Sequence, residues 1–465
     1  MIHQILKIFK STEVWLLMSL ILAFGCGMKS KSQVYNVLDY GAKGDSITND
    51  TEAIQSAIDA ATAVGNQAMV LIPGGYQFLT GTLELESDME FRIEEGACLL
   101  VSTHQEDYAG DAVIVANDAH YLTISGNGII YGRAMEFMEY YEEENKWWIP
   151  KKWRPRLLIL TGCSNLHISN ITIKRAPSWS LHMLGCENVL IDAIHIRNQL
   201  DVPNCDGIDP DHCRNVEIRN CYIACGDDAI VVKTTRQESD YGPSSNIWLH
   251  DYVLETQDSG LKIGTETTQD IFNILFERCK IKSCCRGLTI QLRDEGNVEN
   301  ITFRDISFTS CYHSDPWWGR GEAISFTAIP RNTGSPIGKI SNVRVENVNG
   351  TAENSIRING SKDSRIQQVW FDQVDLTLNR WTKYQGGSYD NRPTTAYDEI
   401  EIHSTPGYYI RYADQLCIRN SSLKWGENSP VYFSHLLEAH DVSVLDIEGL
   451  AGDAAKPGIA RSKVN

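Results

Sequence analysis

The hexapeptide "NVEIRN", residues 215–220, belongs to a repeat that decides the fold. The pattern is Asn, an aliphatic residue, any residue, an apolar residue, and usually Asn or Asp two positions later. Copies begin at Asn165, Asn188, Asn215, Asn246, Asn273, Asn300 and Asn342, with weaker ones at Gln368, Gln415 and Asp441. From 165 to 300 the steps are 23, 27, 31, 27 and 27 residues. A period of this length indicates a solenoid with one coil per repeat.

Alternating apolar residues within each copy favour short strands. We therefore predict an all-β fold, a single-stranded right-handed parallel β-helix. The recurring Asn predicts amide side chains that hydrogen-bond from coil to coil at a bend. Cys163, Cys186 and Cys213 each stand two residues before a repeat Asn, and they predict an interior ladder of small residues.

A capping helix is predicted at the amino-terminal end of the solenoid. In "NDTEAIQSAIDAA" from Asn49, Glu52 follows the candidate N-cap by three residues, and Ala53, Ile54, Ala57, Ile58 and Ala61 form one apolar face. No linker divides residues 33–450, so we predict one domain there, followed by a tail at 451–465.

Residues 1–25 are typical of an export signal. Lys7 and Lys10 precede the apolar run 14–24, which is too short for a membrane span. "LAFGC" resembles a lipoprotein cleavage box, so we expect Cys26 to be lipidated, with an ordinary signal peptide as the alternative. Two or more acyl chains would anchor the protein stably. The expected location is the periplasm or outer membrane of a Gram-negative bacterium, as a lipoprotein.

The composition limits the classes of partner and cofactor that we expect. A formal net charge of −18 argues against nucleic-acid binding, which usually needs a basic face. The cysteines form no CxxC pair and no common zinc spacing, so neither a metal nor another cofactor is expected. Disulfides remain open for an exported chain. We expect a monomer that meets the membrane only through its lipid.

Aspartates cluster in "NCDGIDPDHCRNVEIRNCYIACGDDAIVVK", residues 204–233. Asp206 and Asp227 are 21 residues apart, close to one coil, and adjacent strands lie about 4.8 Å apart. Asp206, Asp227 and Asp228 are therefore expected to share one outer groove, where repulsion raises at least one pKa. Asp209 and Asp211 are explained as well by an architectural role at bends.

Paired carboxylates of this kind suit glycoside hydrolysis, in which one protonates the leaving oxygen and another activates water. "NCDGID", "CGDDAIVVK" and "VLDYGAKGDSITNDTEAIQSAI" resemble the polygalacturonase family, glycoside hydrolase family 28, among the pectin lyase-like β-helix proteins. The resemblance covers about residues 33–450. It implies Asp228 as general acid, with Asp206 and Asp227 positioning the attacking water in an inverting reaction.

The same resemblance suggests substrate-binding residues. Asn204 is kept from the family's NTDG motif, and Cys205 replaces its Thr. Trp179 and His182 in "APSWSLHMLGCENV" are candidate sugar contacts, although a packed histidine is an equal explanation for His182.

Two family motifs are altered. Ser259 stands where the GHG motif has His, and Thr289 and Gln291 replace the Arg and Lys of the RIK motif, which hold a galacturonate carboxylate. An arginine fork recognises carboxylates specifically, so its loss predicts a substrate other than plain polygalacturonan. Lys262 and Arg293 are candidates for a rebuilt cationic subsite; solvent-facing charges are the alternative.

Tryptophan residues are the remaining indication of carbohydrate binding. Trp317 and Trp318, like Trp147 in another loop, are candidate platforms for sugar rings or, equally, loop core. Long loops near Trp147, Trp317 and Tyr384 predict a pocket and exo-action. The leading interpretation is an exported glycoside hydrolase acting on a pectic polysaccharide or oligosaccharide. A polysaccharide lyase on the same fold and a non-catalytic carbohydrate-binding surface protein are the alternatives.

Overall fold

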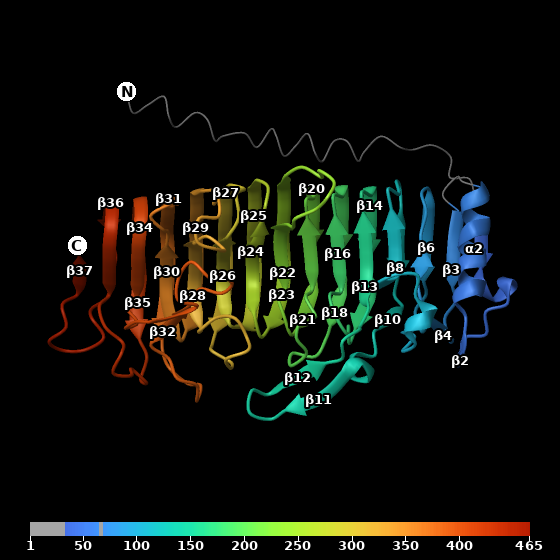
Figure 1. Cartoon of the computed structure of the whole chain (residues 1–465), viewed down its shortest axis with the longest axis horizontal. Helices are drawn as coiled ribbons and strands as arrows, with labels where there is room; N and C mark the ends of the chain where they lie inside the picture. Colours follow the sequence, from blue (N-terminus) through green and yellow to red (C-terminus); the bar gives the residue numbers. More distant parts are fainter. Residues whose placement is uncertain (1–32, 65–67) are drawn as a thin grey trace, which may run out of the picture. The chain divides into compact units, whose positions relative to one another are not determined.

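The computed structural model describes residues 33–64 and 68–465. The signal segment 1–25 and Cys26 lie outside the described residues. Contacts divide the chain into Met1–Gln33 and Val34–Asn465, and the second unit contains the fold. In it, a sheet of 33 strands winds into a parallel β-helix, with the coils stacked along its length (Figure 1).

Three ladders of parallel strands form the three faces of the coils. The first face carries β1 (Val34–Asn36), β3 (Ala68–Ile72), β6 (Met89–Ile93), β9 (Thr123–Gly126), β14 (Ser164–Ser169), β17 (Glu187–Asp192) and β20 (Arg214–Arg219). The second carries β2 (Asp45–Asn49), β4 (Gln77–Thr80), β7 (Cys98–Val101), β10 (Ile129–Tyr131), β15 (Thr172–Lys174), β18 (His195–Arg197), β21 (Tyr222–Cys225) and β35 (Ser422–Trp425). Longer strands run from the first face into the second: β23 (Ser244–Thr256), β25 (Ile271–Cys284), β27 (Val298–Ser310), β29 (Ile340–Ala352) and β31 (Gln367–Leu378).

The third face carries the aspartates. Its strands are β5 (Leu83–Glu84), β8 (Ala112–Asn117), β13 (Arg156–Thr161), β16 (Leu181–Leu184), β19 (Ile208–Asp211), β22 (Ile230–Thr234), β24 (Ser259–Thr267), β26 (Arg286–Leu292), β28 (Glu322–Ala328) and β30 (Asn354–Asn359). The series ends with β34 (Tyr408–Arg419), β36 (Leu437–Glu448) and β37 (Ser462–Val464). Because β37 pairs with β36, the sheet extends into the segment predicted as a tail.

The stacking follows from the repeat residues. Asn246 donates from Nδ2 to Asn215 Oδ1 at 3.2 Å and accepts from Asn273 Nδ2 at 3.1 Å, as the predicted amide ladder requires. Its φ is 56°, a left-handed conformation that Asn adopts more readily than most residues. Inside, Cys163, Cys186 and Cys213 are buried. The twelve cysteines that the structure describes are free thiols.

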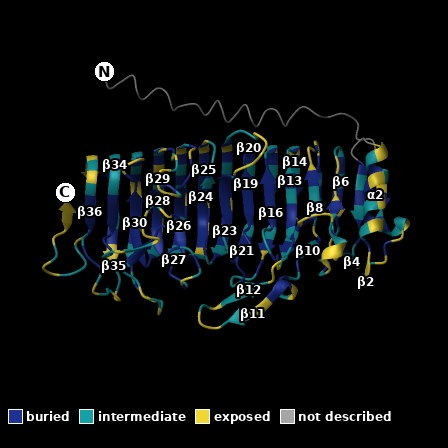
Figure 2. Ribbon diagram, viewed as in Figure 1, coloured by how far each residue is buried: buried dark blue, intermediate teal, exposed yellow. Residues whose placement is uncertain are grey.

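One helix covers the first coils. α2 (Thr51–Val64) buries Ile54, Ala57, Ile58 and Ala61, which confirms the predicted apolar face, while its other side is exposed (Figure 2). Its first backbone bond runs from Ile54 N to Asp50 O, so the cap is one residue later than predicted. Short 3-10 helices occupy Val37–Tyr40, Gln105–Asp107 and Ala134–Phe137. Within residues 33–64 and 68–465, no helix is long and apolar enough to cross a membrane.

Two antiparallel hairpins and one loop extend from the coils. β11 (Met138–Glu142) pairs with β12 (Trp147–Pro150), and β32 (Ser388–Asp390) pairs with β33 (Ile400–Ile402). The β11–β12 hairpin projects below the stacked coils in Figure 1. The segment Cys311–Gly321 joins β27 to β28.

Candidate active site

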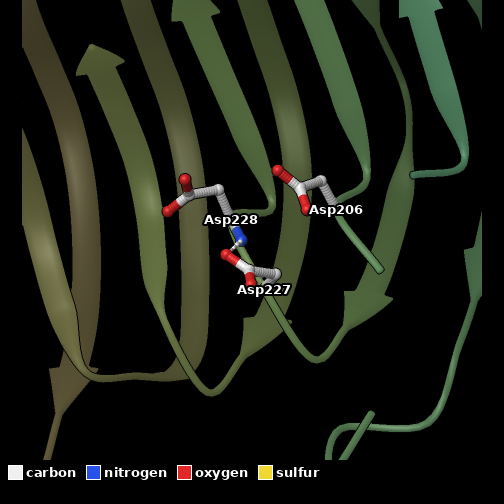
Figure 3. Close-up of side chains that lie close together, drawn as sticks. All are labelled: Asp206, Asp227 and Asp228. Carbon is white, nitrogen blue, oxygen red and sulfur yellow. Dashed lines mark hydrogen bonds between the residues drawn. The ribbon is translucent and has the colours of Figure 1, made fainter. Parts of the chain in front are cut away.

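Three carboxylates meet at the start of two adjacent coils of the third face. Asp206 stands two residues before β19, and Asp227 and Asp228 stand just before β22. Ile208 and Ile230 are partners in the β19–β22 ladder, and Gly207 N donates to Asp228 O at 2.9 Å. This register brings one carboxylate oxygen from each aspartate within 4.8 Å of the others (Figure 3). The convergence expected from coil spacing is therefore present.

Backbone amides orient the middle carboxylate. Asp227 Oδ1 accepts from Asp228 N at 2.9 Å, and Oδ2 accepts from Asn204 N at 3.0 Å. The exposed Asn204 also accepts from Arg154 Nη2 through Oδ1 at 2.7 Å. Asn204 thus positions Asp227 through its backbone, and its side chain is fixed by an arginine that sequence reasoning missed.

Burial and mutual repulsion perturb these acids. The pKa of Asp227 is raised to about 7, chiefly by burial and then by Asp206 and Asp228. The pKa of Asp206 is raised well above its usual range, again chiefly by burial, with Asp209 as the next cause. Both shifts have the direction expected for clustered carboxylates. The cluster therefore retains protons at a pH where isolated aspartates would be ionised.

Two buried lysines face the carboxylates. Lys262 Nζ donates to Asp228 Oδ2 at 2.6 Å, and each side chain is 5% exposed. Lys233 Nζ lies 2.8 Å from Asp209 Oδ1 and 3.6 Å from Asp206 Oδ2. Lys262 was a predicted cationic residue, and Lys233 was missed because it ends an apolar strand, "AIVVK". Asp209 is buried in this ion pair, so it is more than a bend residue.

A fourth carboxylic acid adjoins the cluster. Asp258 is buried just before β24, and its Oδ1 accepts from Ser259 Oγ at 2.9 Å. Its pKa is raised to about 8 by burial and then by Asp228 and Asp227. The spacing from Asp228 to Asp258 is 30 residues, close to the 31-residue step between Asn215 and Asn246, and this signal could have identified it. The backbone of Ser259 donates to Asp228 Oδ1 at 3.3 Å.

On the other side of the cluster, Trp179 contacts cations. Arg156 and Lys233 place their charges 4.3 and 3.9 Å from its ring centroid. His182 is buried; its Nε2 lies 3.1 Å from Asp211 Oδ2, and its Nδ1 lies 3.1 Å from Arg156 Nη1. His182 is therefore the packed histidine of the two explanations, and Asp211 is architectural. Trp179 remains half-buried near the acids.

Three predicted sugar contacts lie elsewhere. Arg293 is fully buried and donates to Leu292 O, Thr327 Oγ1 and Asn391 O, so its guanidinium is engaged within the fold. Strand alternation places Arg293 on the outer face with Gln291, and the segment between β32 and β33 covers both through Asn391 O and Arg392 O. Trp317 is also buried, 5.7 Å from the ring of Trp147, and is loop core rather than a platform. Trp318 is half-buried.

The predicted loops contact one another. Besides the Trp147–Trp317 pair, Ser314 Oγ donates to Asn145 O at 2.8 Å, and the rings of Tyr312 and Tyr384 lie 5.4 Å apart. Arg392 joins them, donating to Asp315 O and Trp317 O at 2.9 and 3.0 Å. Hairpin β11–β12, Cys311–Gly321 and the segment around 384–392 are therefore joined by direct contacts.

Asp206, Asp227 and Asp228 are also the one group in the described part of the chain with the geometry to hold a metal ion. The Lys262 ammonium already occupies Asp228 Oδ2, which opposes a cation there. The arrangement instead suits acid–base chemistry, because protonated and ionised carboxyl groups lie side by side.

Comparison with known proteins agrees with this geometry. The family model "Glycosyl hydrolases family 28" matches residues 64–387, more than half of the chain. A probable polygalacturonase of Vitis vinifera is 31% identical over 233 residues, 46% of each chain. An exo-poly-alpha-D-galacturonosidase of Dickeya chrysanthemi is 25% identical over 59% of this chain and 54% of its own length. This chain spans about half the length of the curated relatives that it matches first.

Solved structures share the fold. A family 28 exopolygalacturonase of Yersinia enterocolitica has a TM-score of 0.68 at 19% identity, covering 92% of this chain and 80% of its own. An exopolygalacturonase of Thermotoga maritima has a TM-score of 0.67 at 21% identity, covering 85% and 93%. The predicted all-β, right-handed parallel β-helix is thereby confirmed.

Proposed function

The chain belongs to glycosyl hydrolases family 28, and on that premise we propose that it hydrolyses O-glycosidic bonds in a pectic polysaccharide or oligosaccharide. The observation that carries the proposal is the convergence of Asp206, Asp227 and Asp228 from adjacent coils. Holding three carboxylates together, two of them buried and one half-buried, is electrostatically costly, and perturbed acids of this kind concentrate at functional sites.

In the proposed reaction Asp228 protonates the leaving oxygen, and Asp206 with Asp227 binds and deprotonates the attacking water. Inverting enzymes usually leave roughly 6.5 to 9.5 Å between their carboxyl groups. The oxygens here approach within 4.8 Å, so the water would contact the cluster from its open side rather than lie between two distant groups. Proton NMR of the first-formed anomer tests inversion.

The substrate is proposed to differ from plain polygalacturonan. Thr289 and Gln291 occupy the positions of the family's Arg and Lys, and Thr289 Oγ1 is buried without a partner. The names of the relatives support a pectic substrate, and the contacts that join the three loops support exo-action at a chain end. We also propose that the protein is an exported monomer, anchored through Cys26 in the periplasm or outer membrane.

The test is a screen of the purified protein on pectic backbone, pectic side-chain and non-pectic oligosaccharides. We expect reducing-sugar release that Asp228→Asn abolishes. Unsaturated, ultraviolet-absorbing products would instead support a lyase, for which Lys233 and Lys262 would supply the neutralising charge. Binding without cleavage, unaffected by Asp228→Asn, would support a non-catalytic surface protein. Rapid release of galacturonate from plain polygalacturonan would contradict the proposed change of substrate.

A further inference from the structure

Lys262 forms an ion pair with the residue that must act as the acid. Its Nζ donates to Asp228 Oδ2 at 2.6 Å. An ammonium beside a carboxylate stabilises the ionised form, whereas a general acid must carry its proton when the sugar is bound. In the free protein, Lys262 therefore opposes the state of Asp228 that the reaction needs.

Lys262 also has unused hydrogen-bonding capacity. An ammonium offers three donors, and the bond to Asp228 is the one that its Nζ makes among the described residues. Lys262 and Thr289 are register partners on adjacent strands, about 4.8 Å apart. Both point away from the core, because their neighbours Leu261, Ile263, Leu288 and Ile290 are buried in it. Thr289 Oγ1 is buried and has no hydrogen-bond partner among the described residues, so Lys262 and Thr289 together offer donors for one further acceptor.

We propose that Lys262 and Thr289 bind a carboxylate of the substrate, and that this exchange releases Asp228 from Lys262 so that it takes up the proton it later donates. The inference rests on the proposed role of Asp228 as acid. Lys262 stays protonated throughout and exchanges Asp228 for the sugar carboxylate. Asp228 takes a proton from solvent, passes it to the leaving oxygen, and returns to its ion pair as a carboxylate; the proton that Asp206 and Asp227 take from the attacking water is returned to solvent.

Access does not distinguish the lysine from the acid. The side chains of Asp228 and Lys262 are each 5% exposed and their charged groups lie 2.6 Å apart, so a sugar that reaches the acid is also within reach of the lysine. The altered family motif fits the same mechanism. The carboxylate clamp is absent at 289 and 291, and a cation one strand nearer to the acid takes its place.

Other charged side chains around the Asp228–Lys262 ion pair also influence whether its carboxyl group is protonated. The groups that face it are Asp206 and Asp209 from the β19 coil, Asp227 and Lys233 from the β22 coil, Asp258 from the β24 coil and Arg286 from β26. Carboxylates outnumber cations here. Release of Lys262 therefore favours uptake of a proton by the cluster.

The experiment compares two oligosaccharides that differ only in whether the uronic carboxyl is free or reduced to the alcohol. In the wild-type protein, the high-pH limb of kcat should lie about one pH unit higher with the acidic substrate, because bound carboxylate frees the acid. Lys262→Met should lower kcat/KM for the acidic substrate on the order of 100-fold and affect the reduced one far less. The difference in pH limb should disappear. Lys262→Arg is the matched variant that keeps the charge and most of the selectivity.

Equal losses on both substrates, with unchanged pH limbs, would show a structural lysine and overturn the inference. Calorimetry adds a readout independent of turnover. D-galacturonate should bind the wild-type protein more tightly than D-galactose, and Lys262→Met should remove the difference. Selectivity absent from the wild type in both assays would also overturn it. If Asp228→Asn leaves hydrolysis intact, the proposed function fails; if hydrolysis depends on Asp228 but ignores the carboxyl, only this inference fails.

Discussion

Asp258→Asn should make the protein less sensitive to rising pH. The carboxyl group of Asp258 is buried, and its pKa is raised to about 8 by burial and by Asp228 and Asp227. In the unfolded chain an aspartate has a pKa near 4. The folded protein thus binds this proton more tightly, so its stabilising contribution is full below about pH 4 and is lost as the pH rises toward 8.

The magnitude follows from the size of the shift. Three pH units between pH 4 and pH 7, at about 1.4 kcal/mol each, give about 4 kcal/mol as an upper bound for an isolated group. Asp258 shares its proton equilibrium with Asp227, Asp228 and Lys262, so we expect about half of that, ~2 kcal/mol. Asn has nearly the same shape and no ionisation, so Asp258→Asn should recover this amount at pH 7 and almost none at pH 4.

Urea unfolding at pH 4, 5.5 and 7 measures the effect. Asp305→Asn is the matched control, because Asp305 is an exposed aspartate at a solenoid bend and its substitution should leave the pH dependence unchanged. The reasoning is refuted if Asp258→Asn and the wild type differ by the same free energy of unfolding at all three pH values. A constant difference would mean that only packing around Ser259 had changed.

Three further predictions concern the ladder, the loops and the cations. Asn246→Ala should lower the free energy of unfolding in urea by about 2 to 4 kcal/mol, because it removes two hydrogen bonds of the Asn ladder and places Ala in a left-handed backbone conformation. Asn246→Gly should lower it by roughly half as much, because Gly adopts that conformation without strain. Equal losses in the two variants would exclude backbone strain as a cause. Trp317→Ala should loosen the contacts that join the loops and shift products from single sugars toward longer oligosaccharides by chromatography; an unchanged pattern argues against loop-enforced exo-action. Arg156→Ala should raise KM, with a fold-change at least ten times that in kcat. The reason is that the Arg156 guanidinium lies over the Trp179 ring and orients it, and makes no hydrogen bond to the three catalytic aspartates. A loss confined to kcat would contradict this.

Sequence reasoning reached the fold because a solenoid repeats its local signals. The Asn ladder, the cysteine ladder and the apolar face of α2 each depend on residues a few positions or one coil apart. The convergence of Asp206 with Asp227 depends on the same period. Features that depend on insertions were less accessible. Trp317 is buried because Trp147, about 170 residues earlier, packs against it, and no periodic signal connects them.

The neighbours of the acids were partly predictable in the same way. Asp258 was missed although it lies one coil beyond Asp228. Lys262 was predicted as a cation, but its partner depends on which side chain of the preceding coil lies closest. Arg293 shows the limit of alternation: it points outward with Lys262, yet the loop after β32 closes over it and accepts its hydrogen bonds through Asn391. Alternation assigns a face and says nothing about what covers that face.

The coil-by-coil construction also explains how recognition can change while the acids stay. Asp206 belongs to the β19 coil and Asp227 and Asp228 to the β22 coil, whereas Ser259 and Lys262 lie on β24 and Thr289 on β26. The register of β19 and β22 is set by their own ladder, in which Ile208 pairs with Ile230, so outward-facing side chains on β24 and β26 can change without changing that pairing. Ser259 and Lys262 both reach back to Asp228, Ser259 through its backbone N–H and Lys262 through Nζ. On the proposed role of Asp228, the cation at position 262 links the coils that recognise the substrate to the acid, so its substitution is expected to affect both specificity and rate.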